Sequence, residues 1–198
     1  MTKPPDIADA AEAALFREKA LAELALAERH VAAETGGGWS GDPMAAVALV
    51  KGVPGPAEAS GGEVLSGPDG DAVAKALAAL GYSGTTFATL SRIDVASAPE
   101  GGPVRLREQI EAVEPDLVIA LDSAAAEDLS AAFGCTLLVP GHPVRVLGRT
   151  LLALSGMEAS LGDERDKAAV WAEFRSLLHD PEDMLRGASG RPGDQQLF

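Results

Sequence analysis

The chain has 198 residues, enough for one domain with a sizeable core. Its 30 acidic and 16 basic residues give a formal net charge of -14, which opposes tight DNA binding because lysines and arginines supply that affinity at phosphates. The single cysteine, Cys135, excludes an internal disulfide framework and a cysteine-ligated zinc or iron–sulfur site. We predict no cofactor and no metal. Because no long apolar run and no signal-peptide core occur, we expect a cytoplasmic protein that does not bind membranes.

The sequence divides into three segments. Residues 1–43 are expected to form an N-terminal helix and a connector, residues 44–178 the main domain, and residues 179–198 a disordered tail, because that tail is polar and rich in glycine. The helix is predicted over residues 7–34 and ends at a run of glycines. Its apolar stripe recurs every three or four positions. The stripe consists of Phe16, Ala20, Leu24, Ala27 and Val31.

Strand and helix patterns alternate through the main domain. This alternation predicts a three-layer αβα sandwich with a mostly parallel central sheet of about four to five strands. Strands are expected at 45–51, 85–90, 116–121, 136–139 and 150–154. Helices are expected at 71–80, at 104–113, at 123–133 with Ser123 as its cap, and from Asp163 onward.

A glycine-rich loop follows the first predicted strand of the main domain and precedes a helix that begins at Asp71. In open α/β sheets, ligands bind in the crevice beyond the carboxyl ends of the strands, so this loop is the default site. Gly55, Gly62 and Gly67 would let a phosphate or a flipped nucleotide approach the backbone; the equal alternative is that they only preserve an inherited loop shape. The loop matches neither GxGxxG nor GxxxxGK[ST], the usual nucleotide-binding motifs.

The spacing of this loop resembles the first motif of the uracil-DNA glycosylase superfamily, most closely its four-cysteine bacterial and archaeal branch. Val53, Pro54 and Gly55 fall on the Ala-Pro-Gly of that motif, and Leu65 falls on the aromatic residue that stacks on uracil. The segments 113–129 and 166–174 are similar to the family's sheet-centre strand and final helix. The resemblance therefore implies the family's fold over residues 44–178.

The resemblance does not extend to the chemistry. The positions of the family's catalytic carboxylate, uracil-reading Asn and late-loop His correspond to Gly52, Leu90 and Met157, and the four cluster cysteines are missing. Base excision needs a carboxylate that positions water or stabilises the developing sugar cation. It also needs hydrogen-bond donors that stabilise the departing base anion. We therefore expect a catalytically inactive member that acts as an interaction module in DNA repair or replication.

Two other functions stay open. Glu58 in the loop and His142 before a proline would be substitute catalytic residues of an active glycosylase on a damaged base, although a solvated loop carboxylate and a turn histidine are simpler interpretations. A nucleobase- or nucleotide-binding protein would tolerate the acidity better than a DNA-binding protein.

The end of the printed sequence carries a second resemblance. Gln195, Gln196, Leu197 and Phe198 are similar to the bacterial sliding-clamp-binding peptide, in which a Gln is followed by a Leu-Phe pair. In the usual five-residue form the leading Gln would fall on Asp194, so the match is partial. Two interpretations therefore stay open: an unremarkable terminus, or a peptide whose partner is the sliding clamp.

Overall fold

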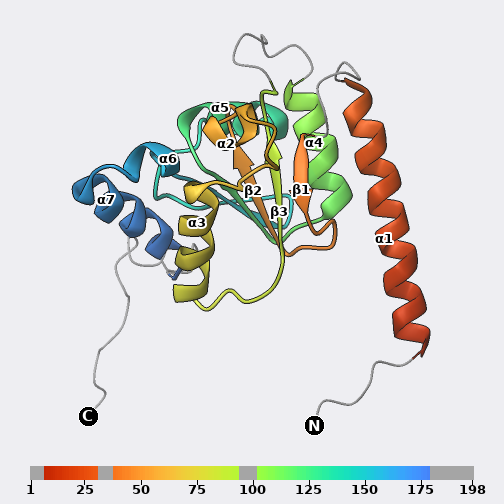
Figure 1. Cartoon of the computed structure of the whole chain (residues 1–198). Helices are drawn as coiled ribbons and strands as arrows, with labels where there is room; N and C mark the ends of the chain where they lie inside the picture. The colour runs from red at the N-terminus through yellow and green to blue at the C-terminus, as the bar shows by residue number, and fades with distance from the viewer. Residues whose placement is uncertain (1–6, 31–37, 94–101, 179–198) are drawn as a thin grey trace, which may run out of the picture.

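The computed structural model describes residues 7–30, 38–93 and 102–178. Its centre is a mixed, mostly parallel sheet of six strands in the order β1-β3-β2-β4-β6-β5 (Figure 1). Strands β2, β3, β4 and β6 pair in parallel, and β1 and β5 pair antiparallel at the two edges. The strands are β1 (Trp39–Gly41), β2 (Val47–Lys51), β3 (Thr86–Leu90), β4 (Leu117–Ala120), β5 (Val144–Val146) and β6 (Arg149–Ala153).

Helices cover both faces of the sheet (Figure 1). On one face lie α1 (Ile7–Ala27), α4 (Gly102–Val113) and α5 (Ser123–Phe133). On the other lie α3 (Pro68–Ala79), α6 (Met157–Ser160) and α7 (Glu164–Arg175). The remaining helical elements are the short helix α2 (Pro56–Ala59) and the 3₁₀ turns η1 (Glu28–His30) and η2 (Ser176–Leu178).

The central strands are apolar at nearly every position because both of their faces are buried. All five residues of β2 and all four of β4 are buried. Successive side chains of β2 alternate between the two cores: Ala48 and Val50 face α4 and α5, whereas Val47 and Leu49 face α3 and α7. The two core clusters thus hold the carboxyl ends of β2, β4 and β6 at one edge of the sheet, where the site loop begins.

The sheet has six strands, so the expected four to five were too few. The connector that follows the N-terminal helix contains β1, whose Trp39 stacks on Phe87 of the neighbouring strand. The turn-rich crossing after Pro140 contains β5, which forms a hairpin with β6. Short edge strands give too little apolar alternation to be recognised in a sequence.

Residues 136–139 do not form the expected strand. Leu138 is buried in the core, but only Pro140 makes an isolated bridge, to Ala153. The β-prone residues there follow a helix stop at Gly134, which adopts the left-handed conformation. Packing under α5 therefore outweighs their strand propensity.

The helix boundaries also differ from the expected ones. The first helix ends at Ala27 rather than at residue 34, and Phe16 is half exposed, although Ala20, Leu24 and Ala27 are buried as expected. Val31 lies outside the described residues. The cap of α5 is Asp122, not Ser123, because the Asp122 carboxylate accepts a hydrogen bond from the Ala125 amide. None of the described helices is long and apolar enough to cross a membrane.

Candidate functional site

A pocket of about 420 Å³ opens at the carboxyl ends of the parallel strands, where the topology predicts a ligand site. Lys51 at the end of β2, Asp122 after β4 and Gly156 after β6 contribute to its wall. Asp69 on α3 and Glu158 on α6 complete its charged lining. Ser123 and Ala124 of α5 also line it, so the pocket joins three strand ends and three helices that are distant in the sequence.

Lys51 is the centre of a buried ion cluster in this region. Its ammonium nitrogen lies 2.7 Å from Asp69 Oδ2, 3.0 Å from Glu58 Oε2 and 2.9 Å from Glu158 Oε2. The side chains of Lys51, Glu58 and Asp69 are about 5% exposed or less, whereas Glu158 is 42% exposed. One cation is thus surrounded by three carboxylates, of which only Glu158 remains open to solvent.

The cluster changes the acid–base properties of its members. Burial by itself lowers the pKa of Lys51, but hydrogen bonds to Asp69, Glu158 and Glu58 outweigh burial and raise that pKa above its usual range. Burial raises the pKa of Glu58, but the Leu65 amide and Lys51 outweigh it, so the pKa lies below the ordinary value. Both groups are therefore charged at neutral pH.

Glu58 fixes the shape of the site loop. Its Oε2 accepts hydrogen bonds from the Gly55 amide at 2.9 Å and from Lys51, and its Oε1 accepts one from the Leu65 amide at 2.8 Å. These bonds hold Leu65 in the left-handed region, at a φ of 58°, which is unfavourable for a leucine. The carboxylate of Glu58 is thus occupied by loop donors, and its predicted catalytic role stays a prediction.

His142 lies away from this cluster. It is exposed in the turn before β5, where its Nδ1 lies 3.0 Å from the carbonyl oxygen of Pro140. It is not part of the pocket wall, and none of its contacts in the described part of the chain involves Glu58 or Lys51. The structure therefore does not bring the two predicted substitute residues together.

Gly52 occupies a position with no room for a side chain. A Cβ built there would overlap Asp122 Oδ1 and lie 2.6 Å from the Ala124 Cβ. The Gly52 amide also donates a 2.8 Å hydrogen bond to Asp122 Oδ2. A carboxylate from the start of α5 therefore fills the space beside Gly52.

Sequence reasoning missed the role of Asp122 at the site. The aspartate directly follows a buried strand and precedes a helix, a placement typical of both an N-cap and a strand-end site residue. The pattern predicts Ser123 as the cap and so gives no separate reason to place Asp122 at the site. Asp122 performs both functions, because one oxygen caps α5 and the other binds Gly52.

The other predicted loop positions divide between the pocket and the core. Val53 lines the pocket, and Pro54 and Gly55 follow it, half buried. A Cβ at Gly55 would meet Lys51 Nζ and both Glu158 carboxylate oxygens. A side chain at this position would therefore displace the ends of Lys51 and Glu158.

Leu65, Leu90 and Met157 belong to the apolar core on the α3 and α7 side. Leu90 and Met157 are less than 10% exposed, and Leu65 is partly buried against the same cluster. Met157 also reaches the pocket wall. Leu90 does not line that pocket and has no polar atom in its side chain, so it offers no hydrogen bond to a ligand there.

A second buried polar network, which the sequence did not reveal, lies at the carboxyl end of β3. The Arg105 guanidinium, 2% exposed, donates to the Leu90 carbonyl and to Glu28 Oε1 at 3.2 Å. Burial lowers the pKa of Arg105, and Glu28 opposes this effect. Gln109 links Glu28 to Thr89 through bonds of 2.6 and 2.8 Å. The network fastens η1 and α4 to the sheet.

Arg92 and Asp128 extend this polar layer toward the site. Arg92 donates to both carboxylate oxygens of Asp128 at 2.8 Å, and Ser91 donates to the same carboxylate at 2.7 Å. The hydrogen bonds to Asp128 raise the pKa of Arg92. Its positive charge is therefore neutralised locally rather than presented to a ligand.

Within the described ranges, no group of three or more histidine, cysteine, aspartate or glutamate side chains is placed to hold a metal ion. Cys135 is a free thiol, partly buried against the core. The predicted partner-binding residues Gln195, Gln196, Leu197 and Phe198 lie outside the described residues.

No protein-family model matches the chain, and no curated protein matches it significantly. The fold and the chemistry of the site therefore carry the functional argument.

Proposed function

We propose that this chain is a divergent three-layer αβα protein of the uracil-DNA glycosylase type, without base-excision activity, that acts as an interaction module in DNA repair or replication. We infer the absence of base-excision activity from the contact between Gly52 and Asp122. The position that the resemblance assigns to the catalytic carboxylate has no space for one, because Asp122 and Ala124 occupy it.

The state of the remaining acidic groups supports the same conclusion. A glycosylase needs a carboxylate that is free to orient water or to stabilise a sugar cation. Glu58 and Asp69 are buried against Lys51, and the Asp122 oxygens accept bonds from two backbone amides. The side chains at the base-reading positions, Leu90 and Met157, are part of the apolar core.

Electrostatics argues against a DNA-binding crevice. The pocket wall carries one cation, Lys51, and three carboxylates, those of Asp69, Asp122 and Glu158. A phosphate entering this pocket would meet a net negative charge, in a chain whose overall charge is -14. A protein partner tolerates such a surface better than a DNA strand does.

The partner that we propose is the bacterial sliding clamp, bound through Gln195, Gln196, Leu197 and Phe198. This choice rests on the sequence resemblance of these residues to clamp-binding peptides. An extended peptide with two adjacent large apolar residues gains affinity by burying them in a pocket of its partner. The acidic domain would then contribute contacts of its own or recruit a further protein.

Single-turnover cleavage tests the inactivity. Oligonucleotides that contain uracil or hypoxanthine, single- and double-stranded, are incubated with excess protein, with an abasic oligonucleotide as control and an active uracil glycosylase as reference. We expect no cleavage above the rate without enzyme. Cleavage that collapses in Glu58→Gln, His142→Ala or Asp122→Asn would contradict the proposal and identify an active glycosylase with relocated groups.

Clamp binding is tested separately on the full chain by surface plasmon resonance. We expect binding that Leu197→Ala with Phe198→Ala abolishes. The matched control is Met184→Ala with Leu185→Ala, which removes two large apolar residues from the same segment and should leave binding unchanged. Absence of binding by the unmodified chain would overturn the clamp proposal without affecting the conclusion on catalysis.

A second candidate function is binding of a free nucleobase, and the size of the pocket favours it. Small-molecule sites commonly have volumes of about 300–1,000 Å³, a range that includes this pocket. Carboxylates accept hydrogen bonds, so a base with an exocyclic amine, such as cytosine, fits the acidic wall better than uracil. Calorimetric titration should then detect cytosine, with loss of binding in Glu158→Gln; no heat with either base would remove this candidate.

A further inference from the structure

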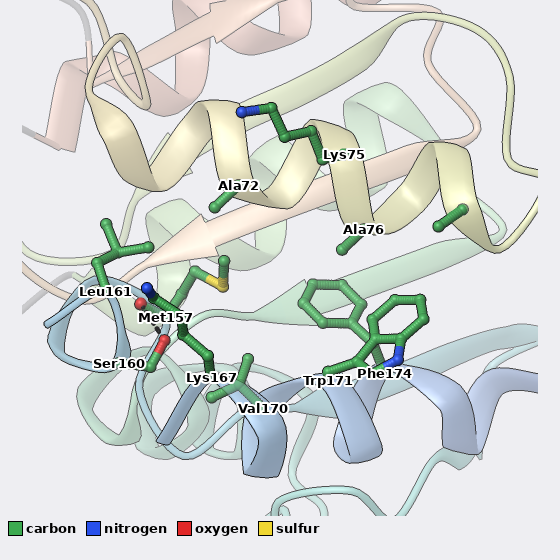
Figure 2. A pocket seen from close by; sticks show the side chains of 11 residues that line it. Ala72, Lys75, Ala76, Met157, Ser160, Leu161, Lys167, Val170, Trp171 and Phe174 are labelled. Atoms are coloured by element: carbon green, nitrogen blue, oxygen red, sulfur yellow. Dashed lines mark hydrogen bonds between the residues drawn. The ribbon is translucent and has the colours of Figure 1, made fainter. Parts of the chain in front are cut away.

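Among the described residues, two apolar surfaces outside the charged pocket are candidate binding surfaces. One is a groove of about 400 Å³ between α3 and α7, where Ala76 faces Trp171 (Figure 2). The charges around this groove do not select an occupant, because Lys75 extends away from it and Lys167 already pairs with Glu164 at 2.7 Å. The other surface is the outer side of α1, where the pattern of residues does select one.

The side of α1 that faces away from α4 is exposed. α1 forms one edge of the molecule, beside α4 (Figure 1). Among the described side chains of α1, those of Ala20, Leu24 and Ala27 are buried, whereas every residue from 10 to 19 is exposed. Most of the stability of a helix in a protein comes from packing of its apolar face against other elements. Residues 10–19 bury no side chain in this way within one copy of the chain.

Six exposed residues on this side of α1 repeat in heptads. From residue 12 onward they are separated by three, four, three, four and three positions, the spacing of the a and d positions of a coiled coil. The a positions are Glu12, Lys19 and Leu26, and the d positions are Leu15, Ala22 and Arg29. All six are exposed, Leu15 at 67% and Leu26 at 50%. The three buried residues of α1 fall at b and f positions, on the opposite side, so the helix can pack on α4 and on a second helix at once.

We propose that this face of α1 is the interface of a homodimer, in which the α1 helices of two copies of the chain pair antiparallel as a short coiled coil. Reversing the direction of one helix brings its d positions against the a positions of the other. Leu15 of each copy then packs on Leu26 of the other, and Arg29 of each copy pairs with Glu12 of the other. The interface therefore has one leucine layer and one ion pair on each side of its centre.

The central layers contain no unfavourable contact. Ala22 is small and leaves room for the aliphatic stem of Lys19 of the other copy. The ammonium group of Lys19 keeps its contacts with two carboxylates of its own copy. The flanking carboxylates, those of Glu18 and Glu23, face uncharged residues of the other copy in this register.

The charges of the helix favour a second copy as the occupant. Glu12 and Arg29 have no ion-pair partner in the described part of the chain, so each is available at one end of the interface. A parallel pair would bring Arg29 beside Arg29, and like charges placed in this way are destabilising. Residues 10–29 hold four acidic and three basic residues, so two copies of this segment repel each other little although the whole chain has a net charge of -14.

Sedimentation equilibrium of the full chain at several concentrations tests the dimer. We expect the unmodified chain to dimerise, and Glu12→Arg and Arg29→Glu each to weaken dimerisation about tenfold, because like charges then meet at both ends. An equimolar mixture of these two variants should associate as tightly as the unmodified chain, since both end layers again combine opposite charges. A monomer at every concentration, unchanged association of the single variants, or a mixture that associates no more tightly than they do would overturn the proposal.

Disulfide trapping tests the antiparallel register, because the chain has only one cysteine. In a Cys135→Ser background, a Leu15→Cys protein is mixed with a Leu26→Cys protein, and mild oxidation should link the two. Neither protein alone should form a dimer, because the two copies of either position lie about 16 Å apart along the axis, beyond the reach of a disulfide.

The matched control mixes Leu21→Cys with Leu26→Cys. Leu21 is also exposed, at 41%, but it lies at a c position away from the seam. We expect little or no disulfide in this mixture. Equal trapping in the control, or trapping of either single protein with itself as efficient as in the Leu15→Cys and Leu26→Cys mixture, would contradict the antiparallel pair.

Discussion

The ammonium nitrogen of Lys51 lies 2.7 Å from Asp69 Oδ2, and each of the two side chains is only 5% exposed. The lysine is the last residue of a fully buried strand, so its charge is largely shielded from bulk water. A buried charge is tolerated when it is paired and hydrogen-bonded, and its removal leaves the partner uncompensated. Lys51 therefore holds the site loop, α3 and α6 together at one point.

Removing this cation should destabilise the fold strongly. Lys51→Met leaves the buried Glu58 and Asp69 carboxylates without their cation, a change that typically costs about 3–5 kcal/mol of unfolding free energy. Urea denaturation followed by circular dichroism measures the loss. Lys19→Met is the control, since Lys19 also contacts two carboxylates but is half exposed, and its midpoint should barely move. Equal midpoints for the two variants would contradict the role assigned to Lys51.

The same cluster predicts how stability depends on pH. The pKa of Glu58 is lowered in the folded protein, so the stability it contributes is present above its ordinary value of about 4.3 and is lost as the pH falls through the folded value. The pKa of Lys51 is raised, so its contribution persists up to about pH 10 and is lost only in strong alkali.

Unfolding midpoints measured from pH 3 to pH 8 test this expectation. Stability should be flat from about pH 6 to 8 and should fall below about pH 4.5. Glu58→Gln should lower stability between pH 6 and 8 and make its decrease at acid pH less steep. The reason is that the variant lacks a carboxylate that takes up a proton when the protein unfolds in acid. An equally steep decrease in Glu58→Gln would show that other carboxylates cause the fall.

Gly52 should not tolerate even a methyl group. The Cβ of Gly52→Ala would overlap Asp122 Oδ1 and lie 2.6 Å from the Ala124 Cβ, so the start of α5 must move, and overpacking of this kind costs about 1–3 kcal/mol. Gly162→Ala is the matched control, because nothing lies within 4 Å of a Cβ built there. Denaturant midpoints compare the two. A neutral Gly52→Ala would remove the main structural support for the inactivity of the site.

We expect Arg105 to stabilise the packing of η1 and of the end of α1 against the rest of the fold. Arg105→Leu removes the cation that holds Glu28 and the donor to the Leu90 carbonyl, and we expect a loss of about 3–5 kcal/mol. Amide hydrogen exchange should also accelerate across α1, more than in the other helices. The control, Arg165→Leu, changes an exposed arginine of α7 and should leave α1 exchange unaltered. Uniform acceleration over all helices in Arg105→Leu would argue against a local fastening role.

Several features of the site could be anticipated from local sequence. The position of the loop follows from a short apolar run ending in Lys51 and bounded by glycines and prolines, and β2 ends at that lysine. The stop of α5 at Gly134 follows from glycine's access to the left-handed conformation. Such features depend on residues that are close in sequence, so a single sequence specifies them.

The ion cluster could not be anticipated in the same way. Its carboxylates come from α2, from α3 and from α6, and Glu158 is more than 100 residues after Lys51 in the chain. The sequence predicts Glu58 as a loop carboxylate and a candidate catalytic residue, and nothing local indicates that it is buried against Lys51. Pairing between distant charges depends on which strand ends the fold makes neighbours, and periodicity carries no information about that.

The sequence by itself determined the alternating α/β order and the buried parallel strands, because strands covered on both faces must be apolar throughout. The tertiary structure alone decided that β1 and β5 close the edges, that Asp122 fills the space beside Gly52, and that Lys51 is neutralised by three carboxylates. The physical reason is the separation in sequence of the residues that interact. Backbone preference and the pattern of burial depend on near neighbours in the chain. Excluded volume and charge pairing at the site act between distant residues that only the completed sheet brings into contact.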